Sequence, residues 1–179
     1  MSSQAKLHIL FCRDEIEATV KRLAAEIRGD YYDKYPLLIG VLKGSFMFMA
    51  DLIRLLDFPL EVDFMRLSSY GRGRQSSGRI KVVQGLRSEV RGRDVLVIED
   101  IVDTGLTTSF LLDYLRKKKP TSLKLCALTD KPSRRRIPVT IDYLGFTVTD
   151  KFLVGYGLDW DERFRNLPDI HVLEGDIPF

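Results

Sequence analysis

The sequence has few of the residues that build disulfide frameworks or imidazole-based sites. Its 179 residues include two cysteines, Cys12 and Cys126, and two histidines, His8 and His171. Two cysteines do not make a disulfide framework. Because the histidines stand at opposite ends of the chain, we expect neither a His-based metal site nor a Ser-His-Asp triad. Any catalysis must therefore use carboxylates, lysine, hydroxyl groups and a metal ion.

Long apolar runs and a strong excess of charge are also missing from the sequence. No run approaches the roughly eighteen apolar residues that span a bilayer, and residues 1–6 lack the apolar core of a secretory signal. The net charge of +3 is too small to indicate a nucleic-acid-binding protein by itself. With 45% hydrophobic and 30% charged residues, we expect a single cytoplasmic globular domain over residues 1–179.

Short apolar runs alternate along the chain with segments of helical spacing, which is typical of an α/β fold. We predict a mostly parallel central sheet flanked by helices. The expected strands are 7–12, 37–42, 60–67, 80–84, 95–98 and 123–128; the expected helices are 14–28, ended by Gly29, a second to about residue 56, and a third over about 107–119. Strand-like pieces at 143–146, 151–154 and 170–173 fall outside this alternation. With the N-terminal segment, they predict a small hood subdomain over about 143–179.

The stretch from residue 95 to residue 108 is the centre of the functional prediction. It begins with a buried strand, continues with the acids Glu99 and Asp100, and then turns through Asp103, Thr104 and Gly105 into a helix. In open α/β sheets, ligands bind outside the carboxyl ends of the strands. We therefore look for a site here.

Each part of this stretch suits a different chemical group. Backbone N–H groups at Thr104 and Gly105, with the hydroxyls of Thr107 and Thr108, can hold a single phosphate. The neighbouring acids would repel that phosphate unless the ligand also carries hydroxyl groups for them. A sugar phosphate fits, with a divalent cation to offset the remaining negative charge. The alternative is an ordinary capped helix whose acids are solvated.

Three other segments carry possible chemistry. The turn Lys43-Gly44-Ser45 follows strand 37–42 and could bind a second anion, although its lysine could equally point to water. In residues 68–79, ten of twelve residues are Ser, Gly or Arg; we favour a mobile lid over the site rather than a hairpin loop with RNA-like character. The triplet Arg134-Arg135-Arg136 is expected to be a solvated basic loop rather than a nucleic-acid contact.

Residues 99–108, which read EDIVDTGLTT, resemble the phosphoribosyl pyrophosphate-binding signature of type I phosphoribosyltransferases. The flanking sequence is similar to the hypoxanthine-guanine branch, from about residue 8 to residue 173. The resemblance implies transfer of the 5-phosphoribosyl group from phosphoribosyl pyrophosphate to N9 of hypoxanthine or guanine, giving IMP or GMP and pyrophosphate. It further implies Mg²⁺ as cofactor and a homodimer or homotetramer.

The resemblance also assigns roles to individual residues. Asp103 would be the general base toward purine N7. The ribose and phosphate ligands would be Glu99, Asp100, Asp103, Thr104, Gly105, Leu106, Thr107 and Thr108, and the metal ligands Glu99, Asp100 and Asp159. The pyrophosphate ligands would be Leu42, Lys43, Gly44, Ser69, Tyr70 and Arg165, with a non-proline cis peptide expected near Lys43. The base would contact Lys131, Phe152, Leu153 and Asp159.

Lys131 provides a physical basis for the choice of base. Its ammonium group is a donor without acceptor capacity, so it can bond the exocyclic oxygen of a 6-oxopurine but would meet the amino group of adenine donor to donor. Leu106 is a departure from some relatives, which carry lysine beside the 5′-phosphate; phosphate binding here would depend on N–H groups and threonines.

Two main alternatives and a weaker third remain open from the sequence. One is a phosphoribosyltransferase that prefers xanthine or another base. The other is a regulator that binds phosphoribosyl pyrophosphate without turnover, and a plain nucleic-acid-binding module ranks third. The presence of Asp103 and of the pair Ser69-Tyr70 favours catalysis, because a sensor needs neither.

Overall fold

A six-stranded sheet forms the centre of the protein in the computed structural model, which describes residues 6–69 and 80–175. The strand order is β4-β3-β2-β5-β6-β7, and all neighbours are parallel except β3 and β4. The strands are β2 (Leu37–Leu42), β3 (Glu61–Ser69), β4 (Ile80–Gln84), β5 (Asp94–Val102), β6 (Ser122–Asp130) and β7 (Tyr143–Thr147). This architecture confirms the predicted α/β class.

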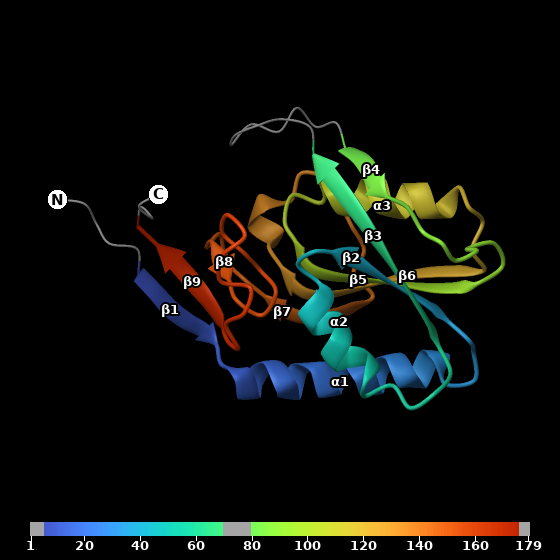
Figure 1. The fold of residues 1–179 in the computed structure, drawn as a ribbon, viewed down its shortest axis with the longest axis horizontal. Helices are drawn as coiled ribbons and strands as arrows, with labels where there is room; N and C mark the ends of the chain where they lie inside the picture. The colour runs from blue at the N-terminus through green and yellow to red at the C-terminus, as the bar shows by residue number, and fades with distance from the viewer. Residues whose placement is uncertain (1–5, 70–79, 176–179) are drawn as a thin grey trace.

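Helices cover both faces of this sheet (Figure 1). They are α1 (Arg13–Tyr31), α2 (Phe46–Ile53) and α3 (Leu106–Arg116), with a short 3-10 helix, η1 (Pro132–Arg134). Alternate residues of the strands pack in two separate cores: Leu96 and Ile98 join the core of α1 and α2, whereas Val95 and Val97 join that of α3. Strands buried on both faces explain why the central strands read as continuous apolar runs.

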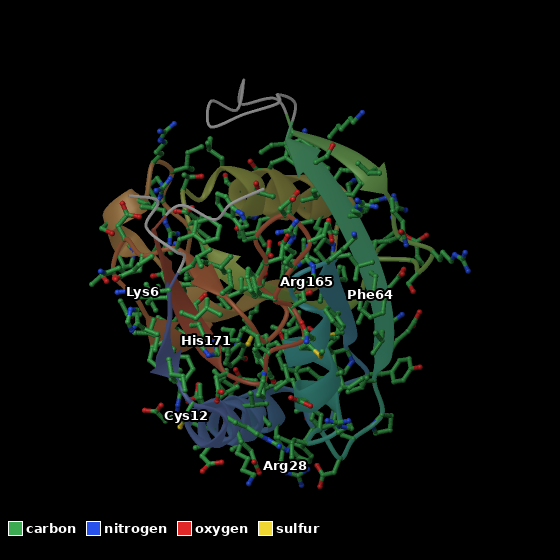
Figure 2. The ribbon with its side chains drawn as sticks, turned by 60° about the vertical axis from the view of Figure 1, so that its left-hand side comes forward. Lys6, Cys12, Arg28, Phe64, Arg165 and His171 are labelled. Carbon is green, nitrogen blue, oxygen red and sulfur yellow. The ribbon has the colours of Figure 1, made fainter. Side chains whose placement is uncertain are left out.

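A small antiparallel sheet stands at one end of the molecule (Figure 1). Its order is β1-β9-β8, with bounds β1 (Lys6–Phe11), β8 (Leu153–Val154) and β9 (Ile170–Glu174). In Figure 2, Lys6 marks the start of β1 and Cys12 lies between β1 and α1, and His171 lies on β9 opposite Ile9. This sheet contains the N-terminal segment and two of the three strand-like pieces that we predicted for the hood.

One strand that we expected in the hood belongs to the central sheet instead. β7 pairs in parallel with β6, with Cys126 opposite Tyr143, and the buried Tyr143 packs in the core of α1 and α2. The backbone N–H of Leu125 donates to the Asp142 carboxylate over 2.8 Å, which fixes the start of β7 beside β6. The hood prediction therefore began too early, because the connection from β6 to β7 holds only η1 and hides the strand–helix alternation.

Two element boundaries also differ from the predictions. β5 extends to Val102, so Glu99 and Asp100 lie within the strand rather than beyond it. β3 extends to Ser69 and takes the first two residues of the segment predicted as a lid; residues 70–79 lie outside the described part of the chain. Among the described residues, no helix is long and apolar enough to cross a membrane.

Gly29 does not end α1, contrary to the prediction. The helix continues to Tyr31, and the N–H of Tyr32 donates to the carbonyl of Arg28 over 3.0 Å. Tyr31 is buried with 1% of its surface exposed. Burying this large side chain in the core favours two more helical residues over a glycine stop.

We expect Gly29→Ala to stabilise the protein by about 0.5–1 kcal/mol, because alanine is the better residue in a helix interior. A Cβ atom at Gly29 would meet no heavy atom within 4 Å. The measurement is chemical denaturation monitored by circular dichroism. Gly92→Ala is the matched control: Gly92 also has open space but a φ of +70°, so alanine there should destabilise by roughly 1–2 kcal/mol. A loss of stability in Gly29→Ala would contradict the helical assignment.

Candidate active site

The carboxyl ends of three parallel strands bring the predicted site residues to one edge of the sheet. β2 ends at Leu42, β5 at Val102 and β6 at Asp130. Val102 and Asp130 are paired in register, and the N–H of Lys131 donates to the carbonyl of Val102 over 3.0 Å. The segments that follow these strands are thus neighbours, as the switch-point rule for open α/β sheets leads one to expect.

The turn between β5 and α3 has the form of an anion cradle. Gly105 has a φ of +82°, and a Cβ atom there would lie 2.4 Å from the carbonyl oxygen of Ile137, so only glycine fits. The carbonyl of Thr104 accepts hydrogen bonds from the N–H groups of Arg136 and Ile137, over 2.9 and 3.2 Å. α3 begins directly after Gly105, so the N–H groups of its first turn lack partners within the helix and point toward this edge.

The side chains of the cradle are not equally accessible. Thr107 is exposed and Thr104 and Leu106 are half-buried, whereas Thr108 is 3% exposed. Thr108 is therefore the most buried of the three threonines that we assigned to the phosphate.

Glu99 and Asp100 are adjacent carboxyl groups inside β5. Glu99 is 5% exposed, and burial, followed by the charge of Asp100, raises its pKa well above the ordinary value. Burial also raises the pKa of Asp100 to about 6, although the nearby charge of Arg165 works in the opposite direction. A Cβ atom on Gly44 would lie 1.7 Å from Oδ2 of Asp100, so this carboxyl group rests directly against the turn after β2.

The donor chemistry of this acid pair fits a divalent cation that is also held by a ligand. Two buried carboxylates that repel one another gain from an added positive charge, and Mg²⁺ is commonly bound by one or two carboxylates together with substrate phosphates. In residues 6–69 and 80–175, no three His, Cys, Asp or Glu side chains come together as a metal site. Asp159 pairs with Arg165, and the assignment of Glu99, Asp100 and Asp159 to the metal stays a prediction.

The turn after β2 and the loop before β9 bring two cations together. A cis peptide joins Leu42 and Lys43, as expected from the resemblance. Nζ of Lys43 lies 2.8 Å from Oε2 of Glu162, and the guanidinium of Arg165 pairs with both Asp159, at 2.8 Å, and Glu162, at 3.3 Å. Lys43 and Arg165, which we assigned to pyrophosphate, thus share an ion pair with the same carboxylate, that of Glu162.

Two of the remaining residues assigned to pyrophosphate, Ser69 and Tyr70, are not placed in the same way. Ser69 is the last residue of β3, but its side chain is outside the described part of the structure, and Tyr70 lies wholly outside it. Their predicted role stays a prediction.

Asp103 and Lys131 lie close enough for their charges to interact. Lys131 is 6% exposed; burial lowers its pKa, and the charge of Asp103 opposes that shift. Nε of Arg134 lies 2.9 Å from Oδ1 of Asp103, and its NH1 lies 3.2 Å from Asp150. The basic triplet is therefore not simply solvated, since Arg134 bridges two acids and the largely buried Arg135 pairs with Asp130.

The predicted base-contact residues offer an aromatic face and a free strand edge. Phe152 is 45% exposed and meets Trp160 edge to face, with ring centroids 4.9 Å apart. The N–H of Leu173 donates to the carbonyl of Phe152, which makes Leu153 and Val172 a non-hydrogen-bonded pair. The N–H and carbonyl of Leu153 therefore point away from β9, at the outer edge of the small sheet.

Trp160 and Glu162 were not singled out from the sequence, and Arg134 was singled out only as part of a triplet that we expected to be solvated. Glu162 and Arg165 have the i, i+3 spacing of an ion pair, which was visible in the sequence. The contacts of Arg134 with Asp103 and of Glu162 with Lys43 join segments far apart in the chain, so no local sequence pattern predicts them.

Glu99→Gln should make the ligand-free protein more stable at pH 8. A carboxyl group whose folded-state pKa is raised is protonated in both states below its unfolded pKa, near 4.3, and costs stability as the pH rises through the folded-state value. Glutamine does not titrate, so the gain over the parent should grow from about pH 4 to pH 8. Thermal unfolding across this range measures it, at about 2–4 °C for each kcal/mol.

The control for this pH series is Asp113→Asn, because Asp113 forms an exposed ion pair with Arg116 on α3 and should change little. A Glu99→Gln gain that is the same at pH 4 and pH 8 would show that the carboxyl charge is not its cause.

Comparisons with known proteins agree on one family. A model of the phosphoribosyl transferase domain matches residues 12–161. The hypoxanthine-guanine phosphoribosyltransferase of Bacillus subtilis is 51% identical over 166 residues, which are 93% of this chain and 92% of that protein. The bifunctional protein TilS/HprT of Listeria innocua is 47% identical over 169 residues, which are 94% of this chain but 26% of the bifunctional protein.

Solved structures give the same result. A hypoxanthine phosphoribosyltransferase from Staphylococcus aureus matches with a TM-score of 0.89 and 41% identity, over 93% of this chain and 91% of that one. The acid pair, the glycine turn and the start of α3 thus occur in a chain that resembles these proteins over nearly its whole length. The chain belongs to the phosphoribosyl transferase family.

Proposed function

We propose that this chain transfers the 5-phosphoribosyl group of phosphoribosyl pyrophosphate to N9 of hypoxanthine or guanine, giving IMP or GMP and pyrophosphate. The observation that carries this proposal is the acid pair of the buried Glu99 and the half-buried Asp100 beside the phosphate cradle of α3. A ribose 5-phosphate suits both features, because its hydroxyl groups can bond the two acids while its phosphate binds the cradle. Relatives named hypoxanthine-guanine phosphoribosyltransferase match nearly the whole chain.

Donor binding follows from the order of groups along the sheet edge. The 5′-phosphate takes the N–H groups at the start of α3, and the ribose hydroxyls take Glu99 and Asp100. Lys43 and Arg165 serve the pyrophosphate. Mg²⁺, when bound, neutralises part of the donor's negative charge and stabilises the leaving pyrophosphate; Glu99 and Asp100 would hold it with the substrate oxygens.

The acceptor base lies between Phe152 and the ends of β5 and β6. Phe152 stacks on the ring, Lys131 donates to the exocyclic O6, and the backbone of Leu153 pairs with the base edge. As the bond between N9 and C1 forms, the bond from C1 to the pyrophosphate oxygen breaks and its electron pair leaves with pyrophosphate. Asp103 accepts the proton from N7.

Two further features of the proposed enzyme rest on the resemblance. We expect a homodimer or homotetramer that works in the cytoplasm. Size-exclusion chromatography with light scattering tests the first of these.

A coupled assay with a panel of purine bases tests the proposal directly. Each of hypoxanthine, guanine, xanthine and adenine is incubated with phosphoribosyl pyrophosphate and Mg²⁺, and the nucleotides are identified. Product from hypoxanthine or guanine supports the proposal. Product from xanthine alone would favour a xanthine-preferring enzyme, and binding of the donor without product from any base would favour a regulator.

We expect Asp103→Asn to lower kcat by roughly 10²–10⁴-fold, because asparagine cannot accept the N7 proton, with a much smaller effect on donor affinity. Initial rates and calorimetric titration of phosphoribosyl pyrophosphate separate the two. Asp150→Asn is the matched control, because Asp150 pairs with the same Arg134; it should retain most of the activity. Equal losses of turnover and donor binding in Asp103→Asn would argue against the base role.

Lys131→Gln should relax the discrimination against adenine, because the glutamine carbonyl can accept a hydrogen bond from the amino group of adenine. The ratio of kcat/KM for hypoxanthine to that for adenine should fall about tenfold or more. Lys151→Gln, an exposed lysine paired with Glu174, is the control. An unchanged ratio in Lys131→Gln would remove Lys131 from the base site.

A further inference from the structure

The carboxylate of Glu162 is paired with both Lys43 and Arg165, the two cations that we propose to bind pyrophosphate. Oε2 of Glu162 lies 2.8 Å from Nζ of Lys43 and 3.3 Å from the guanidinium of Arg165. Lys43 and Glu162 are 119 residues apart in the chain. Arg165 is near the middle of the view in Figure 2. A carboxylate shared by two cations from different segments stands where an anionic ligand would make the same contacts.

Arg165 is held in place by other groups, so Glu162 is not needed to position it. Its guanidinium donates to the carbonyl of Gly157 over 2.7 Å and pairs with Asp159. The side chain of Arg165 is 19% exposed, against 60% for that of Glu162. Its buried Nε has no hydrogen-bond partner among the described residues.

The backbone presents Glu162 in an unfavourable conformation. Trp160 and Arg163 exchange two backbone hydrogen bonds, of 3.2 and 2.9 Å, around a two-residue turn. The two central residues, Asp161 and Glu162, have φ values of +49° and +62°. Both central residues of such a turn need positive φ, and asparagine and glycine are the residues that favour it. A glutamate at the position that favours glycine lowers the stability of the folded protein, which indicates that Glu162 has a function.

The loop that carries Glu162 is packed tightly against the turn that carries Lys43. Gly157 has a φ of +100°, and a Cβ atom there would lie 2.1 Å from the carbonyl oxygen of Gly44. The two backbones are therefore in direct contact. The carboxylate can leave Lys43 only by a movement of its own side chain or of the short turn.

We propose that Glu162 competes within the molecule with pyrophosphate for Lys43 and Arg165, and so sets the affinity of the site for phosphoribosyl pyrophosphate and for released pyrophosphate. This inference rests on the proposed function. In the ligand-free protein, Glu162 and Asp159 cancel the charges of the two cations. An incoming pyrophosphate must displace Glu162, whereas Asp159 remains on Arg165.

The test is the affinity of Glu162→Gln for pyrophosphate, measured by calorimetry in the presence of Mg²⁺. We expect Kd for pyrophosphate and KM for phosphoribosyl pyrophosphate to fall by roughly 2–10-fold, the range for one or two partly exposed ion pairs. The difference from the parent should shrink at high salt, since salt screens such pairs. The Kd of GMP should not change, because this nucleotide has no group for Lys43 and Arg165.

Two further variants separate charge from structure. Glu162→Gly removes the carboxylate and relieves the positive φ, so it should raise the melting temperature and give the same gain in pyrophosphate affinity as Glu162→Gln. Asp161→Asn changes a carboxylate in the same turn, for which no ion pair occurs among the described residues, and should leave the affinity as it is.

Weaker pyrophosphate binding in both Glu162 variants, or an equal change for GMP, would overturn the inference and show a structural role. A parent protein that forms nucleotide while both variants bind pyrophosphate as it does would overturn this inference alone. A parent that forms no nucleotide from any base would overturn the proposed function itself.

Discussion

The burial of two adjacent carboxyl groups in the central strand is the interaction on which the rest of the site depends. Glu99 and Asp100 lie inside β5, and burial raises the pKa of both. A protein that maximised its stability would not place two acids there, so the cost indicates a functional requirement. The requirement that fits best is a ligand with hydroxyl groups and a cation, beside a turn built for phosphate.

The charges around this pair are compensated by ion pairs both between loops and within one loop. Arg134 bridges Asp103 and Asp150, and Glu162 joins Lys43 to Arg165. Asp103, Lys43 and Arg165 therefore each have an internal partner in the free protein. Binding exchanges these pairs for contacts with the substrate, so the net gain in affinity is smaller than the number of contacts suggests.

Local chemistry made the central part of the site predictable from the sequence. A continuous apolar run marks a buried parallel strand, and the acids and Gly105 that follow need no distant information to be recognised. The contacts of Glu162 with Lys43 and of Arg134 with Asp103 could not be predicted in this way, because they depend on how the loops meet in three dimensions. β7 was misplaced for a similar reason, since its neighbour in the sheet is fixed by hydrogen bonding to β6 and not by the residues beside it.

Gly29 illustrates the opposite error, in which a local signal was overruled. Glycine after a helical pattern is a common stop, yet the burial of Tyr31 extends α1 past it.

The most direct test of the account as a whole is a crystal structure with phosphoribosyl pyrophosphate and Mg²⁺. The account predicts that the carboxylates of Glu99 and Asp100 face the ribose hydroxyls while the first turn of α3 holds the 5′-phosphate. A complex in which both carboxylates point away from the sugar would contradict it.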